Sequence, residues 1–373
     1  MSAISKTRVA LLLRDPQSSR LLQLFALPEF SKQFSVCVID LNAEKIPLLA
    51  RVYERSRDYL GWAKNSEGNG SPICEHITRK YLTNVDVVIG LDNQLSLVDC
   101  LVRKSHRSLR GFVIQMGTNP KYYNRSQGLV RESPVTLLSW GNREVTDYVR
   151  EGLVPSNIVP IGSLMQALAI RANASNLMSL GTFDVCIVSQ FRPRLVSGID
   201  VSDSARAEAE SMPALLSLIS PILRRLSLST IVALRAEKNL SAAIDAEQER
   251  ECFEKYLSHS FSTTSAAHLF SSYSAVLSSK LTIGRNSGVL FESMGSSSRI
   301  LFVNPTTWHL FDPPRDWPFG LSRPTESELE KSIRGLLKMS DLEYLNATEA
   351  LANKYSAQGV ETLQILLEVI REG

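Results

Sequence analysis

The sequence predicts an α/β protein made of two halves, each built around a mostly parallel β-sheet. Its length of 373 residues exceeds that of an ordinary domain with a single hydrophobic core and suits two domains. Short runs rich in β-branched residues alternate with longer amphipathic runs, which is the pattern of repeated strand–helix–strand units. Apolar residues make up 44% of the chain and charged residues 21%, so the composition is that of a globular protein. We therefore expect two Rossmann-like domains that face each other across a cleft.

Two series of strands divide the chain. In the first series we expect strands at 8–13, 35–41, 85–89, 111–115, 136–139 and 157–160. In the second series we expect strands at 184–189, 230–234, 261–264, 281–284 and 299–304. The change of series falls in a stretch of loop-like composition. These patterns predict an N-terminal Rossmann-like domain at 1–170, a C-terminal one at 171–345, and a helical segment at 346–373.

The charge balance and the N-terminal residues limit which partners and which location we expect. Basic and acidic residues number 41 and 38, which is too even to indicate a nucleic-acid partner or polybasic membrane binding. The apolar run near the N-terminus is too short for a signal peptide, and no run of about 20 apolar residues follows. We expect a cytoplasmic protein that at most docks on the inner face of the membrane or on an assembly complex.

The five cysteines are scattered, with no CxxC or metal-type spacing. An odd, dispersed set favours free thiols in a reducing compartment over a disulfide framework. Three of them, Cys37, Cys100 and Cys186, lie in apolar runs, where a thiol packs as a small hydrophobe.

The strongest local motif follows the expected strand at 281–284. Asn286, Ser287 and Gly288 form a tight polar turn, and a helix starts directly after it. Ser287 suits the N-cap of that helix, whose free N–H groups could receive an anion. Glu292 lies one turn further in, where a carboxylate could accept from a ribose or sugar hydroxyl. The alternative is an ordinary capped helix with a solvated Glu292.

Two other strand ends of the second half carry polar and basic residues. Arg235 and Lys238 follow the strand at 230–234, Ser189 ends the strand at 184–189, and Gln190 and Arg192 follow it. Carboxyl ends of parallel strands meet at one edge of a sheet, where open α/β sheets bind ligands. Together these groups indicate an anionic ligand. For the basic pair alone, a solvated basic turn is the simpler interpretation.

Candidate acid–base residues are few. Asp92 follows a strand of the first half and could act as a general base toward a hydroxyl, although an Asp that caps the next helix is the simpler interpretation. His309 lies in the loop after the strand at 299–304, which should overhang the cleft. The sequence has no GxSxG elbow, P-loop, GxGxxG or HExxH motif, and no Asp-x-Asp motif in a convincing context. We expect neither a metal nor a cofactor.

Several segments resemble a known family. The stretch SKLTIGRNSGVLFESMGSSSRILFVN, with SSYSAVL before it, resembles the C-terminal half of GT-B-type glycosyltransferases, and FVIQMGTN, LLSWGNREVTDYVREG and IVPIGS resemble the end of their N-terminal half. FDVCIVSQFR is similar to bacterial surface-carbohydrate biosynthesis proteins, the group with the lipopolysaccharide, capsule and Kdo-type transferases. The resemblance covers roughly residues 85–305. It implies that Ser287, Gly288 and Glu292 hold the nucleotide and that Arg235 and Lys238 lie near the donor phosphate.

The resemblance also implies a function. It indicates a glycosyltransferase that moves a hexosyl or Kdo-type sugar from a CMP- or UDP-linked donor to a surface polysaccharide or lipopolysaccharide acceptor. The N-terminal domain would hold the glycan acceptor, and the C-terminal domain would hold the nucleotide-sugar. Many relatives have His where this chain has Met116, so any role of that imidazole is absent here. Two alternatives stay open: a sugar-nucleotide 2-epimerase, and a non-catalytic transferase-like scaffold in polysaccharide assembly.

Overall fold

The computed structural model describes residues 6–13, 19–41, 72–105, 108–116, 131–145, 148, 152–174, 182–191, 203–235, 240–264, 270–295, 298–356 and 361–372. The chain forms two compact units, Met1–Ile161 with Glu361–Gly373, and Gly162–Val360. The sequence placed the boundary at 170/171, which lies inside helix α6 (Leu164–Ala174) of the second unit. The last helix, α14 (Thr362–Glu372), belongs to the first unit, where Arg110 Nη2 donates to the Ile370 carbonyl at 2.9 Å.

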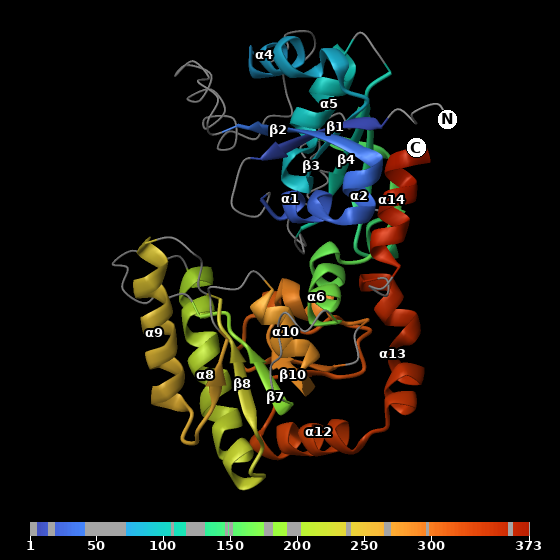
Figure 1. The fold of residues 1–373 in the computed structure, drawn as a ribbon. Helices are drawn as coiled ribbons and strands as arrows, with labels where there is room; N and C mark the ends of the chain where they lie inside the picture. The colour runs from blue at the N-terminus through green and yellow to red at the C-terminus, as the bar shows by residue number, and fades with distance from the viewer. Residues whose placement is uncertain are drawn as a thin grey trace. The chain divides into compact units, whose positions relative to one another are not determined.

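The first unit is a parallel sheet covered by helices (Figure 1). Its strands run in the order β2-β1-β3-β4-β5-β6, and every recorded pair is parallel. They are β1 (Thr7–Leu13), β2 (Phe34–Asp40), β3 (Val87–Leu91), β4 (Arg110–Ile114), β5 (Arg131–Ser139) and β6 (Leu153–Pro160). Its other α-helices are α1 (Ser19–Ala26), α2 (Pro28–Gln33), α4 (Pro72–Tyr81) and α5 (Leu95–Lys104), and its 3-10 turns are Leu82–Asn84, Asp92–Gln94 and Asn142–Val145.

The second unit is also a parallel sheet, with the order β12-β11-β10-β7-β8-β9. Its strands are β7 (Phe183–Val188), β8 (Thr230–Ala233), β9 (Ser262–Thr263), β10 (Ser279–Gly284), β11 (Arg299–Asn304) and β12 (Gly320–Ser322). Its other helices are α8 (Asp203–Arg225), α9 (Leu240–Tyr256), α10 (Ser271–Leu277), α11 (Gly288–Glu292), α12 (Glu326–Lys338), α13 (Asp341–Tyr355) and the 3-10 turn His309–Phe311. Figure 1 shows α8 and α9 side by side. The chain order runs outward from β7 to β9 and then restarts at β10 beside β7, so the winding direction changes between β7 and β10.

These sheets confirm the predicted fold class of two parallel α/β halves, and each expected strand overlaps an observed one. Their near-continuous burial explains why they were recognisable, because a parallel strand covered on both faces is an apolar run. The edge strand β12 was not predicted. It has only three residues, none of them β-branched, so its sequence carries no strand signal. No helix among the described residues is long and apolar enough to cross a membrane.

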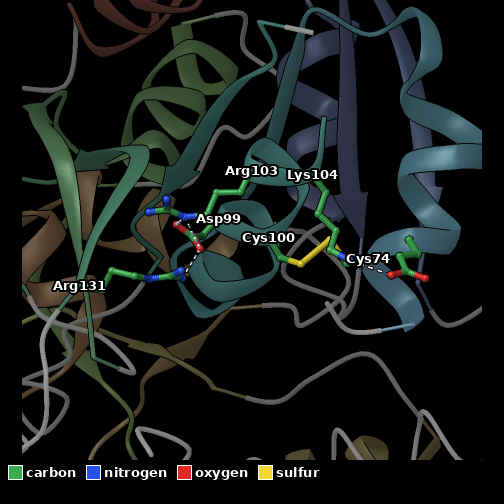
Figure 2. The surroundings of a disulfide bond; sticks show 7 residues. Cys74, Asp99, Cys100, Arg103, Lys104 and Arg131 are labelled. Atoms are coloured by element: carbon green, nitrogen blue, oxygen red, sulfur yellow. Dashed lines mark hydrogen bonds and ion pairs between the residues drawn. A yellow bond between two sulfur atoms is a disulfide. The ribbon is translucent and has the colours of Figure 1, made fainter. Parts of the chain in front are cut away.

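A disulfide joins Cys74 of α4 to Cys100 of α5, with their Cα atoms 6.3 Å apart (Figure 2). The expectation that all five cysteines are free thiols is therefore wrong for this pair. The two residues are 26 positions apart and become neighbours only when the two helices pack on the same face of the sheet. Cys37, Cys186 and Cys252 are free, and burial raises the pKa of the Cys186 thiol to about 12.

Candidate functional site

The centre of the second sheet brings two of the predicted strand ends together. Gln190, just after β7, donates from Nε2 to the main-chain oxygen of Asn286, just after β10, at 2.7 Å. Its Oε1 accepts from Arg285 Nε at 2.9 Å. These contacts lie where the winding direction of the sheet changes, which is the place where open α/β sheets bind their ligands.

Arg285 extends this edge toward β11. Its side chain is buried, and its guanidinium carbon lies 3.7 Å from the centre of the Phe311 ring. A guanidinium stacked on an aromatic face is a favourable cation–π arrangement. Sequence reasoning selected the neighbouring Asn286 and missed Arg285. The available signal was an arginine directly after an apolar strand, which alone does not distinguish a solvated turn from a buried contact.

The ends of β7 and β8 are joined by a residue that sequence reasoning also missed. Glu249 of α9 is 2% exposed and accepts a hydrogen bond from the Ser189 hydroxyl. The main-chain N–H of Arg235 lies 3.1 and 3.2 Å from the two carboxylate oxygens. Ser189 is buried, whereas the Arg235 side chain is exposed. The structure therefore places Arg235 at the same edge as Ser189 and Gln190, as the sequence predicted.

The turn after β10 has the predicted form, with one difference. Ser287 stands at the N-cap of α11 in an extended conformation, but its side chain makes no capping hydrogen bond. Gly284 ends the strand where space is short, since a Cβ there would lie 2.9 Å from Leu290 Cδ1. Asn286, Ser287 and Gly288 are all half-buried. The Ser287 hydroxyl is thus not used for capping, contrary to expectation.

Glu292 is buried, so the alternative of a solvated carboxylate is wrong, whereas its contact with a ribose or sugar hydroxyl stays a prediction. It is 5% exposed, and its carboxylate accepts from the Ser163 hydroxyl and from the Tyr273 hydroxyl at 2.8 Å. The Ser356 hydroxyl donates to its main-chain oxygen at 3.1 Å. These partners come from α10 and from the residues next to α6 and α13, so Glu292 joins three segments that are far apart in the sequence.

His309 lies after β11 and is paired with Asp312. The His309 Nδ1 lies 2.9 Å from Asp312 Oδ2, and the imidazole is 81% exposed. The other carboxylate oxygen of Asp312 accepts from Asn304 Nδ2 at 2.7 Å and from the Ser322 hydroxyl at 2.9 Å. Burial by itself raises the pKa of Asp312, but hydrogen bonds from Asn304, His309 and Ser322 outweigh it and leave that pKa below its ordinary value.

Asp92 lies in the first unit, at the end of β3. It is 4% exposed and opens the 3-10 turn that leads into α5. Gln94, not Asp92, stands at the N-cap of α5, and its Oε1 accepts from the Leu91 N–H at 2.9 Å.

Arg192 and Lys238 lie outside the described residues. Among the described residues, no three His, Cys, Asp or Glu side chains come together to hold a metal ion. The metal-free expectation stays a prediction.

No protein-family model matches the sequence, and no curated protein matches it. Solved structures do match in shape. One is a putative UDP-N-acetylglucosamine 2-epimerase from Listeria monocytogenes, with a TM-score of 0.58, 15% identity, and coverage of 98% of this chain and 96% of that one. Another is the UDP-GlcNAc 2-epimerase of Methanocaldococcus jannaschii in complex with UDP-GlcNAc and UDP, with a TM-score of 0.52, 10% identity, and coverage of 98% and 100%.

A third similar structure is a variant of the wall teichoic acid polymerase TagF, with a TM-score of 0.53, 12% identity, and coverage of 98% of this chain and 89% of that one. At such identities the likeness establishes the fold alone. The chain has the two-domain, GT-B-like α/β fold of these proteins, in agreement with the sequence prediction.

Proposed function

We propose that the protein is a glycosyltransferase that moves a hexosyl or Kdo-type sugar from a CMP- or UDP-linked donor to a surface polysaccharide or lipopolysaccharide acceptor. The observation that carries this proposal is the contact between Gln190 and Asn286 at the winding change of the second sheet. Beside it lie the exposed Arg235 and the Ser287 hydroxyl that capping leaves unused. Such an edge suits an anionic nucleotide.

Each predicted donor residue has a role in this proposal. Arg235, with Lys238 and Arg192, neutralises the donor phosphate, while Gln190 and Ser189 shape the edge. Asn286, Ser287 and Gly288 form the turn that faces the nucleotide. Glu292 supports this turn, because it is 5% exposed and its carboxylate accepts from Ser163 and Tyr273 inside the unit. Cations then supply the charge stabilisation, so the mechanism requires no metal.

In our proposal, His309 takes the proton of the acceptor hydroxyl. An ionised carboxylate only accepts hydrogen bonds, so Asp312 holds the proton of the neutral imidazole on Nδ1 and leaves Nε2 as the basic nitrogen. The acceptor oxygen bonds to the anomeric carbon, the bond from that carbon to the phosphate oxygen breaks, and the nucleotide leaves with the electron pair. Asp92, in the first unit that would hold the glycan acceptor, is the other candidate base.

We place the reaction in the cytoplasm, at the inner face of the membrane. A lipid-linked or growing surface glycan is an acceptor that is met there, and the near-neutral charge of the chain gives no reason for a nucleic-acid partner.

A second candidate is a sugar-nucleotide 2-epimerase, which the names of two of the similar structures favour. That reaction needs acid–base groups around the sugar itself. In the second unit, His309 with Asp312 is the described pair that could supply them.

A thermal-shift screen with CMP, CDP, UDP and GDP tests nucleotide binding first. A ligand at 100 times its Kd should stabilise the protein by about 2.7 kcal/mol. Analysis of products from a radiolabelled sugar nucleotide then separates transfer to an acceptor from epimerisation. Absence of binding to all four nucleotides would contradict both enzymes and favour a non-catalytic scaffold.

Arg235→Ala is the sharpest single variant for the nucleotide site. We expect it to weaken nucleotide binding about tenfold, because an exposed cation beside the phosphate is lost, while the free energy of unfolding changes by less than about 0.5 kcal/mol. Calorimetric titration and a melting curve measure the two quantities. Unchanged binding would assign Arg235 to a solvated turn.

A further inference from the structure

Glu249 is a buried carboxylate that ties two neighbouring strand ends together. It lies on α9, is 2% exposed, and accepts from the hydroxyl of Ser189 after β7. It also accepts from the main-chain N–H of Arg235 after β8, at 3.1 and 3.2 Å from its two oxygens. One side chain therefore fixes the carboxyl ends of two paired strands.

Helix α9 does not need this carboxylate to stay on the sheet. The same helix buries Cys252 and Phe253, and the adjoining Leu257 is buried as well. Removing a carboxylate from water is unfavourable until its hydrogen bonds compensate, and apolar replacements of buried charges are often neutral or stabilising. We therefore explain the burial of a carboxylate at this position by the geometry that it gives the strand ends and not by a gain in stability.

That geometry reaches the ligand-facing groups on both sides. The N–H of Arg235 is held while its side chain is exposed, so the carboxylate sets the point from which the guanidinium leaves the sheet. On the other side, Ser189 precedes Gln190, which donates to the Asn286 carbonyl at 2.7 Å. The carboxylate thus joins the ends of β8 and β7 directly, and Gln190, the neighbour of Ser189, joins the end of β7 to that of β10.

We infer that Glu249 is a positioning residue of the nucleotide site, acting through Arg235 and through Ser189–Gln190 without touching the ligand. The inference rests on the proposed function. The hydrogen bonds of Glu249 with Ser189 and with the Arg235 N–H, here called the clamp, can nevertheless be measured without nucleotide. A carboxylate in direct contact with a phosphate would repel it, and Glu249 is buried behind the strand ends.

The test uses Glu249→Met in the full chain, which keeps the side-chain length and removes both acceptors. Calorimetric titration with CMP, CDP, UDP and GDP should give a Kd about tenfold higher for the nucleotide that wild type binds most tightly. The double variant with Arg235→Ala should show a combined effect clearly smaller than the product of the two single effects, because both act on one group. Effects that multiply fully would overturn the positioning role.

Ser272→Ala is the matched control. Its hydroxyl donates to the carbonyl of Leu234 at 3.4 Å, next to Arg235 but outside the clamp, so the Kd should stay unchanged. A rise as large as that of Glu249→Met would mean that any polar change at this strand end weakens binding, and would overturn the inference.

Amide hydrogen exchange supplies a readout that needs no nucleotide. Glu249→Met should speed exchange at the Arg235 amide, whereas the Leu234 amide, which donates to Thr264 Oγ1 at 2.9 Å, should keep its protection. If the Arg235 amide exchanges faster in Glu249→Met but the wild-type protein binds no nucleotide, the proposed function is wrong and the clamp is confirmed. If the exchange rate of the Arg235 amide is unchanged in Glu249→Met, the clamp is wrong. If Glu249→Met does not fold, Glu249→Gln takes its place, because it turns an N–H toward one of the two donors. This variant must raise both the exchange rate of the Arg235 amide and the nucleotide Kd. If either quantity stays unchanged, the inference is overturned.

Discussion

Both units tie a helix to the sheet through a buried carboxylate, but the two carboxylates act at opposite ends of the strands, and the first unit adds a disulfide. In the first unit a disulfide joins α4 to α5, and the buried Asp99 of α5 pairs with Arg103 at 3.1 Å and with Arg131, at the amino end of β5, at 2.7 Å (Figure 2). In the second unit, the buried Glu249 ties helix α9 to the carboxyl ends of strands. A covalent link mainly restricts the unfolded chain, whereas a buried carboxylate fixes the directions of the groups it binds. The carboxylate of the second unit lies at the carboxyl ends of its strands, the edge where open α/β sheets bind ligands, whereas that of the first unit lies at an amino end.

The largest effect on stability should come from the disulfide of the first unit. Cys74→Ala opens a cross-link between residues 26 positions apart, which should lower the free energy of unfolding by about 3 kcal/mol. Nucleotide binding by the folded protein should not change. Urea unfolding with and without reductant measures this, with the free, partly buried Cys37→Ala as control. The same midpoint under both conditions would contradict a stabilising disulfide.

Glu292→Gln should cost about 2 kcal/mol of stability, because the amide cannot accept from both Ser163 and Tyr273 as the carboxylate does. Glu343→Gln is the control. That exposed carboxylate accepts from the Ser340 N–H at 2.7 Å in the capping box of α13, so its loss should cost clearly less stability than the loss of the Glu292 carboxylate. Thermal melts of both variants decide the matter, and equal losses would mean that burial adds nothing to the contacts of Glu292.

Gly335→Ala should raise stability by about 0.5–1 kcal/mol, because alanine restricts the unfolded chain and favours the helix. Gly335 lies inside α12, where a Cβ would meet no atom within 4 Å, beside a cavity of about 380 Å³ lined also by Leu301 and Phe319. Gly284→Ala should destabilise, since its Cβ would crowd Leu290. Melting curves of the two variants measure both effects, and a lower melting temperature for Gly335→Ala would contradict the open space beside that residue.

The smallest effect concerns the amino edge of the second sheet. Burial by itself raises the pKa of Asp184, but hydrogen bonds from Lys280 and Ser229 outweigh it and lower that pKa. A carboxyl group with a lowered pKa in the folded state stabilises above its unfolded pKa of about 3.9 and loses that contribution as the pH falls through the folded pKa. Asp184→Asn should therefore destabilise at pH 7 and progressively less below about pH 4. A difference that stays constant down to pH 2 would show that the ion pair is not the cause.

The sequence by itself determined the position of each observed strand except β12, and it determined which polar residues follow the strands of the second sheet. Strands buried on both faces must be apolar runs, so β7, β10 and β11 were recognisable from composition alone. The turn at Asn286 and Ser287 was recognisable for the same local reason, since it directly follows such a run. Parallel pairing then places these ends on one edge, whatever the rest of the chain does.

Only the tertiary structure decided which of those groups are buried and by what. Glu249 looks like any charged residue of a polar helix until α9 lies over the ends of β7 and β8. Glu292 looks solvent-facing until Ser163, 129 positions earlier in the chain, reaches its carboxylate, and Cys74 and Cys100 look like free thiols until two helices pack together. The physical reason is the same in each case. Local sequence sets the period of an element and its turns, whereas the burial and partners of a polar side chain depend on residues far away along the chain.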